Sequence, residues 1–188
     1  MQPNNSFSFG GAPGPSFQPQ NILYYKLNVL TNSSSNVGDW EYEYPICGLY
    51  AGTNIAQFIE LIISDDLPAL SPTSDDPLNP PDITITDQCY VVMKITSDKP
   101  TLRYRDGVPA LKTVDDHQDQ YRRLSHVDQD GNMHIGSSTS NCSLIYFAVR
   151  NVAEDEDHPY NIYVQYQDGP AIIQAVIDPA IKNRGGDD

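Results

Sequence analysis

The sequence has few basic residues, few cysteines and no long apolar run. Its 188 residues include 11 Lys and Arg against 25 Asp and Glu, so the formal net charge is −14. Between Lys26 and Lys94 lie ten acidic residues and no basic one. A surface of this sign repels the phosphates of nucleic acids and the headgroups of anionic lipids. The charge therefore predicts that neither nucleic acid nor a membrane is a partner.

The cysteines and the N-terminus point to a compartment. No apolar stretch approaches the roughly 18 residues of a transmembrane helix, and the first residues lack the basic start and apolar stretch of a secretory signal. The three cysteines, Cys47, Cys89 and Cys142, lie far apart without metal-ligand spacing. An odd count of this kind favours free, buried thiols over one disulfide with a spare thiol. We therefore expect a cytoplasmic protein.

Recognisable catalytic motifs are also missing. The chain has no P-loop, no G-x-G-x-x-G and no G-x-S-x-G. The run DQDGN resembles a Ca²⁺ loop, but Gly131 comes too early and Thr139 stands where an EF-hand needs Glu. His126 and His134, on either side of it, would be diagonal neighbours in a two-residue hairpin and lack a third zinc ligand. The sequence thus predicts no catalytic residue, no cofactor and no metal, and an enzyme is the less favoured interpretation.

Apolar alternation with a period of two runs through most of the chain. The last third, Asn141 to Asn183, predicts three strands, CSLIYFAVR, YNIYVQY and AIIQAVI, as a central meander. ILYYKLNVL and WEYEYPI predict two strands that pair, and ITITDQCYVVMKIT predicts a strand pair or one long strand. The dipeptides Asp106-Gly107 and Asp130-Gly131 predict hairpin turns. We therefore expect an all-β fold, a single antiparallel β-sandwich of immunoglobulin-like or jelly-roll-like type, with about seven to nine strands and at most one short helix.

Two segments are ambiguous between helix and strand. In 54–63 the apolar residues fit a helical stripe, yet they also share a strand face, and their β-branched content favours a strand. The best helix candidate is 113–124, because Thr113 is a suitable cap and acidic residues precede basic ones along the segment.

Composition divides the chain into three parts. Residues 1–20 are rich in Gly, Pro, Ser, Asn and Gln and carry no charge, which predicts a disordered tail. Its aromatic residues Phe7, Phe9 and Phe17 permit a second interpretation, an arm that docks on a neighbouring subunit. Residues 21–184 form the predicted β-sandwich domain, and 185–188 a short C-terminal tail.

A few residues are candidates for ligand binding. Trp40 shares a strand face with two tyrosines, which is typical either of a carbohydrate platform or, as we favour, of an aromatic core. The loop 65–82 contains five prolines and five aspartates, and the pairs Asp65-Asp66 and Asp75-Asp76 are possible Ca²⁺ ligands, although solvated loop carboxylates are commoner. Arg103 and Arg105 form the one basic spot, suited to an anionic ligand or to neutralising the acidic surface.

Several phrases resemble a family of small bacterial proteins that carry the label "nucleotide synthetase". They are YYKLNVL, EYEYPICGLY, ITDQCYVVMKIT, LRYRDGVPAL and VIDPAIKNRG, and they span about residues 22–184. The last resembles a D-P-x-I-x-N-P ending, with Arg184 in place of the proline. The resemblance implies kinship among uncharacterised β-proteins and transfers no site residue.

The favoured function is that of a non-enzymatic binding or self-assembling structural module, present as a homo-oligomer, whose small-molecule ligand is unknown. One alternative is a lectin-like module that binds carbohydrate or depends on Ca²⁺. The other, disfavoured because the acidic surface repels phosphates, is an enzyme that acts on a nucleotide, as the family label suggests.

Overall fold

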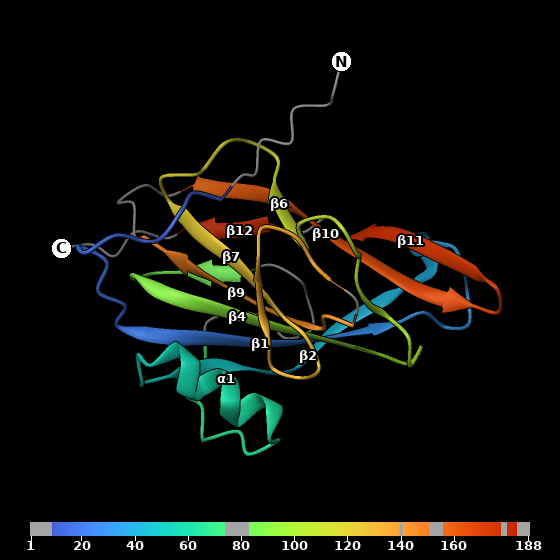
Figure 1. Cartoon of the computed structure of the whole chain (residues 1–188), viewed down its shortest axis with the longest axis horizontal. Helices are drawn as coiled ribbons and strands as arrows, with labels where there is room; N and C mark the ends of the chain where they lie inside the picture. The colour runs from blue at the N-terminus through green and yellow to red at the C-terminus, as the bar shows by residue number, and fades with distance from the viewer. Residues whose placement is uncertain (1–8, 74–82, 140, 151–155, 178–179, 184–188) are drawn as a thin grey trace.

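The protein is a two-sheet, mostly β structure in a computed structural model that describes residues 9–73, 83–139, 141–150, 156–177 and 180–183 (Figure 1). The first sheet has six strands in the order β2 (Glu41–Tyr50), β1 (Asn21–Leu30), β4 (Cys89–Ser97), β9 (Leu144–Val149), β7 (Tyr121–Val127) and β8 (Met133–Ile135). In the second, β11 (Ala171–Ile177), β10 (Glu156–Asp168), β12 (Ala180–Asn183) and β3 (Ile83–Ile85) follow one another, and β5 (Arg103–Tyr104) and β6 (Leu111–Thr113) also pair with β10. The described helices are a short 3₁₀ turn, η1 (Val37–Asp39), and α1 (Ile55–Ile63). The predicted all-β class, with one short α-helix, is confirmed.

The strand pairing differs from a purely antiparallel sandwich. β1 pairs with β4 in parallel from Asn21–Cys89 to Val29–Ser97, and β12 pairs with β3 in parallel. Parallel neighbours need a long crossover, which usually carries a helix. Here the crossover between β1 and β4 includes β2 and α1, and this places α1 on the outer face of the first sheet (Figure 1).

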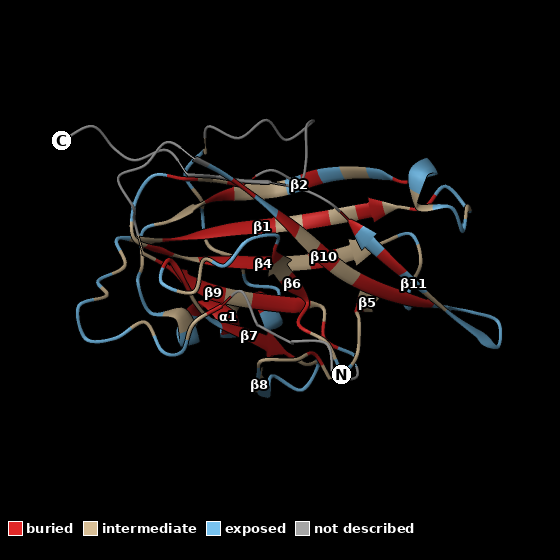
Figure 2. Ribbon diagram, turned by 90° about the horizontal axis from the view of Figure 1, so that it is seen from above, coloured by how far each residue is buried: buried red, intermediate tan, exposed pale blue. Residues whose placement is uncertain are grey.

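Burial follows the alternation of the strands. The side chains of Leu23, Tyr25, Leu27 and Val29 in β1 point between the sheets and are at most 5% exposed. In β10, the face formed by Tyr160, Ile162, Val164 and Tyr166 is at most 1% exposed. Buried residues therefore dominate the central strands (Figure 2). A smaller cluster, with Ile22, Tyr24, Val92 and Leu144 from the sheet, lies on the other face and is covered by α1.

Residues 55–63 form a helix, so the predicted strand is wrong. Phe58, Ile59 and Ile62 are buried on one helix face, whereas Gln57 and Glu60 are exposed. The Asn54 side-chain oxygen accepts a hydrogen bond from Gln57 N at 3.2 Å and caps the first turn. Tertiary packing outweighed the β-propensity of these residues, because the outer face of the first sheet is apolar and is covered by the apolar face of a helix.

Replacing Asn54 with alanine is expected to lower the free energy of unfolding by about 1 kcal/mol. The substitution removes the acceptor for an orphan N–H of the first turn. Asn54→Ser keeps a capping oxygen, so its free energy of unfolding should fall by only a small part of that amount. Urea unfolding of the two variants checks this, and equal losses would show that the cap does not stabilise α1.

The predicted helix over 113–124 is also wrong. β6 ends at Thr113, and β7 begins at Tyr121 and pairs with β9. A single turn remains, in which Gln120 N and Tyr121 N both donate to the carbonyl of His117. The segment has few apolar positions for a helical stripe, so its Tyr121 and Leu124 are buried from a strand instead.

The predicted meander and the first hairpin need correction. β10 and β11 pair as expected, but β9 lies in the other sheet, between β4 and β7. Around Gly107, which has φ 75°, the two arms do not pair with each other. Both arms pair with β10, Tyr104 with Val164 and Leu111 with Ile162, so they act as one interrupted strand. A long central strand offers more hydrogen bonds than a short hairpin partner.

The second hairpin is confirmed with a different register. β7 and β8 pair, but His126 lies directly opposite His134 rather than diagonally. The reason is a longer loop, in which Asp128 N donates to Asn132 O and Gly131 N to Asp128 O. The described cysteines are free, and Cys89 and Cys142 are buried as expected.

The N-terminal segment lies against the domain from Phe9 onward, which differs from a uniformly disordered tail. Phe9 is 8% exposed, and its ring centroid is 5.1 Å from that of Phe147 and 5.9 Å from that of Tyr121. Gly10 pairs with β7, since Gly10 N donates to Tyr121 O and Arg123 N donates to Gly10 O, each at 2.9 Å. The residues before Phe9 lie outside the described part of the chain, and the domain boundaries stay predictions.

Candidate functional site

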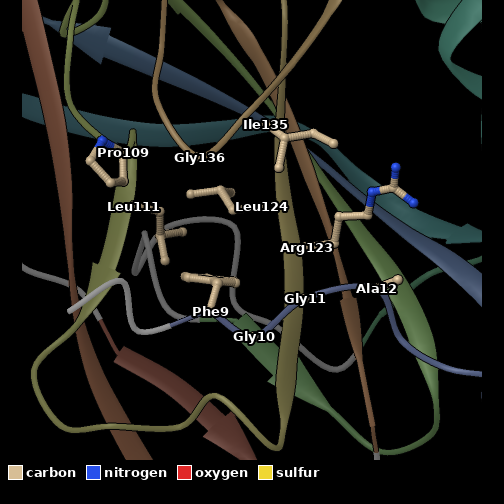
Figure 3. A pocket seen from close by; sticks show the side chains of 10 residues that line it. All are labelled: Phe9, Gly10, Gly11, Ala12, Pro109, Leu111, Arg123, Leu124, Ile135 and Gly136. Atoms are coloured by element: carbon tan, nitrogen blue, oxygen red, sulfur yellow. The ribbon is translucent and has the colours of Figure 1, made fainter. Parts of the chain in front are cut away.

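Two hollows of ligand size differ sharply in chemistry. The first, which we call the arm hollow, has a volume of about 470 Å³ and opens between the N-terminal segment and the loops before β6 and after β8. Figure 3 shows its lining, which consists of Phe9, Gly10, Gly11, Ala12, Pro109, Leu111, Arg123, Leu124, Ile135 and Gly136. The one charged side chain there, Arg123, directs its guanidinium away from Phe9 and Leu111 (Figure 3). The arm hollow therefore offers apolar surface but no side-chain group that would orient a polar ligand.

The second hollow, which we call the basic hollow, has a volume of about 360 Å³ at the end of the first sheet. Its lining comes from β4, the loop into β5 and the first residue of β5, the loop between β7 and β8, and the residues just before β9. The residues are Lys94, Ile95, Thr96, Ser97, Lys99, Pro100, Thr101, Leu102, Arg103, Gln129, Asn141 and Ser143. Three of the 11 basic residues of the chain line it, whereas no carboxylate of the described residues does. The local charge is thus opposite to that of the whole molecule.

Asp98 is the nearest carboxylate in sequence, and it is turned out of the basic hollow. Its oxygens accept hydrogen bonds from Thr31 N at 2.8 Å, Thr31 Oγ1 at 3.0 Å and Ser97 Oγ at 3.0 Å. The bond from the Thr31 amide is the main cause that lowers the pKa of Asp98. This carboxylate is therefore hydrogen-bonded to the end of β1 and forms no ion pair with Lys94 or Lys99 among the described residues.

Lys94 has a second lysine beside it. The parallel register of β1 and β4 puts Lys26 opposite Lys94, and both are half-buried. Neighbouring strands lie about 4.8 Å apart, and like charges at paired positions are destabilising. Neither lysine forms an ion pair with the residues that the structure describes. An anion that binds at Lys94 would relieve this repulsion.

Lys99 and Arg103 are held by the turn between β4 and β5. Pro100 follows Lys99, and Leu102 N donates to Lys99 O at 3.0 Å, as in a turn with proline at its second position. Lys99 Nζ lies 5.7 Å from the centroid of the Tyr166 ring. Arg103 Nη2 is 3.4 Å from Asp106 Oδ2, and its buried Nε makes no hydrogen bond within the described residues. Arg103 is thus partly neutralised by Asp106.

The donor set of the basic hollow suits an oxyanion. Lysine ammonium groups act as point charges for phosphate, and a guanidinium adds planar donors. The hydroxyl groups of Thr96, Ser97 and Thr101 also line the hollow, but they donate to Asn28 Oδ1, Val29 O and Gln167 O, so the charged groups are the donors for a ligand. Such a set can bind and orient a phosphate or a carboxylate, and its size is near the lower end of small-molecule sites, which span about 300–1,000 Å³.

The buried histidines serve the fold. His126 Nε2 accepts from Ala110 N at 3.0 Å, and its Nδ1 lies 3.3 Å from His134 O. His158 Nδ1 is 2.5 Å from the Tyr121 hydroxyl, and the His158 ring stacks on that of His117 at 3.8 Å. Within the part of the chain that the structure describes, no three His, Cys, Asp or Glu side chains are grouped to hold a metal ion. In that same part, no helix is long and apolar enough to cross a membrane.

The residues singled out in the sequence do not form one site. Trp40 is 6% exposed, its indole N–H donates to Ser34 O at 3.1 Å, and its ring lies 6.0 Å from Tyr166, so it belongs to the core. Asp65 and Asp66 are exposed just after α1. Asp75 and Asp76 lie outside the described residues. Arg103 lines the basic hollow but Arg105 does not.

Sequence reasoning missed Lys94 and Lys99. They are the first basic residues after the acidic stretch that ends at Lys94. Their position beside Arg103 depends on the turn after β4. Lys26 and Lys94 meet because β1 and β4 are parallel neighbours, although the two strands are far apart in the sequence. No local pattern indicates this pairing.

The chain was compared with known proteins. A family model described as "Predicted novel nucleotide synthetase" matches residues 52–186, which include every residue named in the lining of the basic hollow and all strands from β3 onward. None of the curated proteins matches the chain.

Proposed function

Because the chain belongs to the family described as predicted novel nucleotide synthetase, we propose that it is a binding module for phosphate-bearing small molecules of the nucleotide class. The basic hollow holds the phosphates. Its local chemistry favours an anion where the net charge of the whole chain disfavours one.

One feature supports this function above the others. Among the described residues, Lys94, Lys99 and Arg103 line a hollow that no carboxylate lines, and Lys26 stands beside Lys94 without an ion pair. Placing like charges together costs free energy unless an anion offsets it. The description of the family supports a nucleotide as the source of that anion.

The residues of the basic hollow bind and orient, and this is why the proposal is one of binding. Ammonium, guanidinium and hydroxyl groups stabilise the charge of a phosphate. A nucleotide synthetase would in addition need groups that activate a nucleophile or hold a metal ion. We therefore propose a non-enzymatic module, and incubation with nucleoside triphosphates and Mg²⁺, followed by chromatography, would reveal turnover if the chain has any.

Isothermal titration with AMP, ADP, ATP, pyrophosphate and inorganic phosphate tests the proposal. We expect saturable binding that weakens with salt, and a loss of about tenfold or more in Lys99→Gln, because hydrogen bonds to charged groups contribute about 1.5–3 kcal/mol. Lys112→Gln is the matched control, since Lys112 Nζ also lies 5.7 Å from a tyrosine ring, that of Tyr163, but lies outside the hollow.

Two results would contradict this function. One is that none of the five phosphates binds or raises the unfolding temperature, since a ligand at a hundredfold excess over its Kd should stabilise by about 2.7 kcal/mol. The other is that Lys99→Gln and Lys112→Gln weaken binding equally, which would mean that net charge rather than the hollow attracts the anion.

Self-assembly stays a prediction beside this function. β11 is an edge strand, and its Ile172 and Val176 are 59% and 38% exposed. Edge strands with exposed apolar side chains are where a second copy can pair. Cytoplasmic location stays a prediction as well.

A further inference from the structure

A groove on the outer face of the first sheet is separate from the basic hollow. It runs between α1 and the β7–β8 hairpin and has a volume of about 580 Å³. Its apolar lining includes Ile59 and Ile63 from α1, Val127 and Met133 from the hairpin, and Tyr146 from β9. We call this surface the helix–hairpin groove.

The floor of the helix–hairpin groove leaves large apolar side chains in solvent. Ile63 is 46% exposed and Met133 is 47% exposed, and they are two of the six large apolar side chains that are exposed among the described residues. At one end Gly131 of the hairpin loop approaches Ile63, whose Cδ1 would lie 3.5 Å from a Cβ added there. Apolar side chains that line a hollow, rather than standing singly, are typical of a docking surface.

The charge around this floor has one sign. Glu60 and Asp130 line the groove, and no Lys, Arg or His of the described part of the chain does. Ser64, at the C-terminal end of α1, also lines it, and the last turn of α1 has no basic residue. The negative end of the helix dipole therefore points to the same place as the two carboxylates. Asp65 and Asp66 follow directly.

We propose that the helix–hairpin groove docks a cationic amphipathic segment of a partner protein. Apolar side chains of that segment cover Ile63 and Met133, and its Lys or Arg side chains meet Glu60, Asp130 and the end of α1. The apolar floor selects for leucine-like anchors, and the acidic rim selects against anionic partners and fixes the orientation. This partner surface goes beyond the proposed function, because it lies outside the basic hollow and uses other residues.

The probe is a fluorescent amphipathic helical peptide made of leucine and lysine, and its comparison peptide has the same composition scrambled so that the two residue types do not segregate. Fluorescence anisotropy at physiological salt should show saturable binding of the amphipathic peptide and much weaker binding of the scrambled one. Equal binding of the two would overturn the proposal, because it would mean attraction to the net charge alone. Absence of saturable binding would overturn it as well.

Substitutions locate the site. Ile63→Ser should weaken the amphipathic peptide about fivefold, because roughly half of the side chain is still exposed and becomes buried on docking. Val114→Ser is the matched control, since Val114 is 62% exposed outside the groove. Glu60→Gln should weaken binding, whereas Glu41→Gln, an exposed site on β2, should not. Both matched pairs behaving alike would overturn the proposal. Pyrophosphate binding should be unchanged in all four variants, so this test and that of the basic hollow fail independently.

Discussion

Replacing Phe9 with alanine is expected to lower the free energy of unfolding by about 3–5 kcal/mol, the usual cost of removing a buried phenyl ring. Phe9 is 8% exposed and packs on Phe147 and Tyr121 of the first sheet. Loss of the ring leaves a cavity between the sheets. It also removes the side chain that anchors the neighbouring Gly10, which lies so close to the Gln118 carbonyl oxygen that a Cβ there would collide with it. Urea unfolding of the variant and of the unaltered chain measures the difference.

Phe17 provides the control for this experiment. It is half-buried and touches the ring of Tyr90 at 5.2 Å from outside the core, so Phe17→Ala should cost much less. Similar losses in the two variants would contradict the packing of Phe9 in the core.

The mass in solution distinguishes two roles of the N-terminal segment. If Phe9 packs within its own chain, Phe9→Ala lowers stability at unchanged mass, and a chain that starts at Asn21 does the same. If it docks on a neighbouring subunit, both changes dissociate an oligomer.

Acid is expected to destabilise the protein between about pH 6.5 and pH 4 through one histidine. Burial is the main cause that lowers the pKa of His126 from its ordinary 6.5 to about 4; the hydrogen bond to the His134 carbonyl opposes the shift, and the charge of nearby His134 adds to it. The side chain is fully buried and its Nε2 accepts the Ala110 amide hydrogen, so the folded protein keeps the imidazole neutral. The unfolded chain binds the proton more readily, so the stabilisation is complete above pH 6.5 and is lost as the pH falls toward 4. This difference in pKa between the unfolded and the folded chain corresponds to about 3 kcal/mol of the free energy of unfolding.

His126→Gln tests the acid effect, because glutamine can keep the hydrogen bonds to Ala110 N and His134 O. A glutamine amide has an oxygen for Ala110 N and an N–H₂ for His134 O. The variant is expected to lose the part of the pH dependence between about pH 6.5 and 4 that His126 causes, whatever its stability at neutral pH, because glutamine does not titrate. Carboxylates with lowered pKa values, such as Asp98, lose their contribution at lower pH and are present in both proteins. An unchanged slope in unfolding free energy against pH would assign the acid sensitivity to other groups.

The candidate site was half visible in the sequence. Arg103 stood out as part of a basic spot, suited to an anionic ligand or to neutralising acidic surroundings, and it does pair with Asp106. The sequence did not indicate the turn at Pro100 or the hydrogen bonds that hold Asp98 at Thr31. A hydrogen bond between residues 67 positions apart decides which side chain faces the hollow.

Local patterns determined the all-β class, the inward faces of β1 and β10, and the turns at Gly107 and Gly131, because strand alternation and left-handed turn positions are written in neighbouring residues. Tertiary structure alone decided that 55–63 is a helix, that β9 and β10 belong to different sheets, and that Lys26 stands beside Lys94. Those outcomes depend on which apolar face needs a cover and which distant strand supplies the hydrogen bonds. Such free energies arise only when separate segments meet, so no single stretch of the sequence contains them.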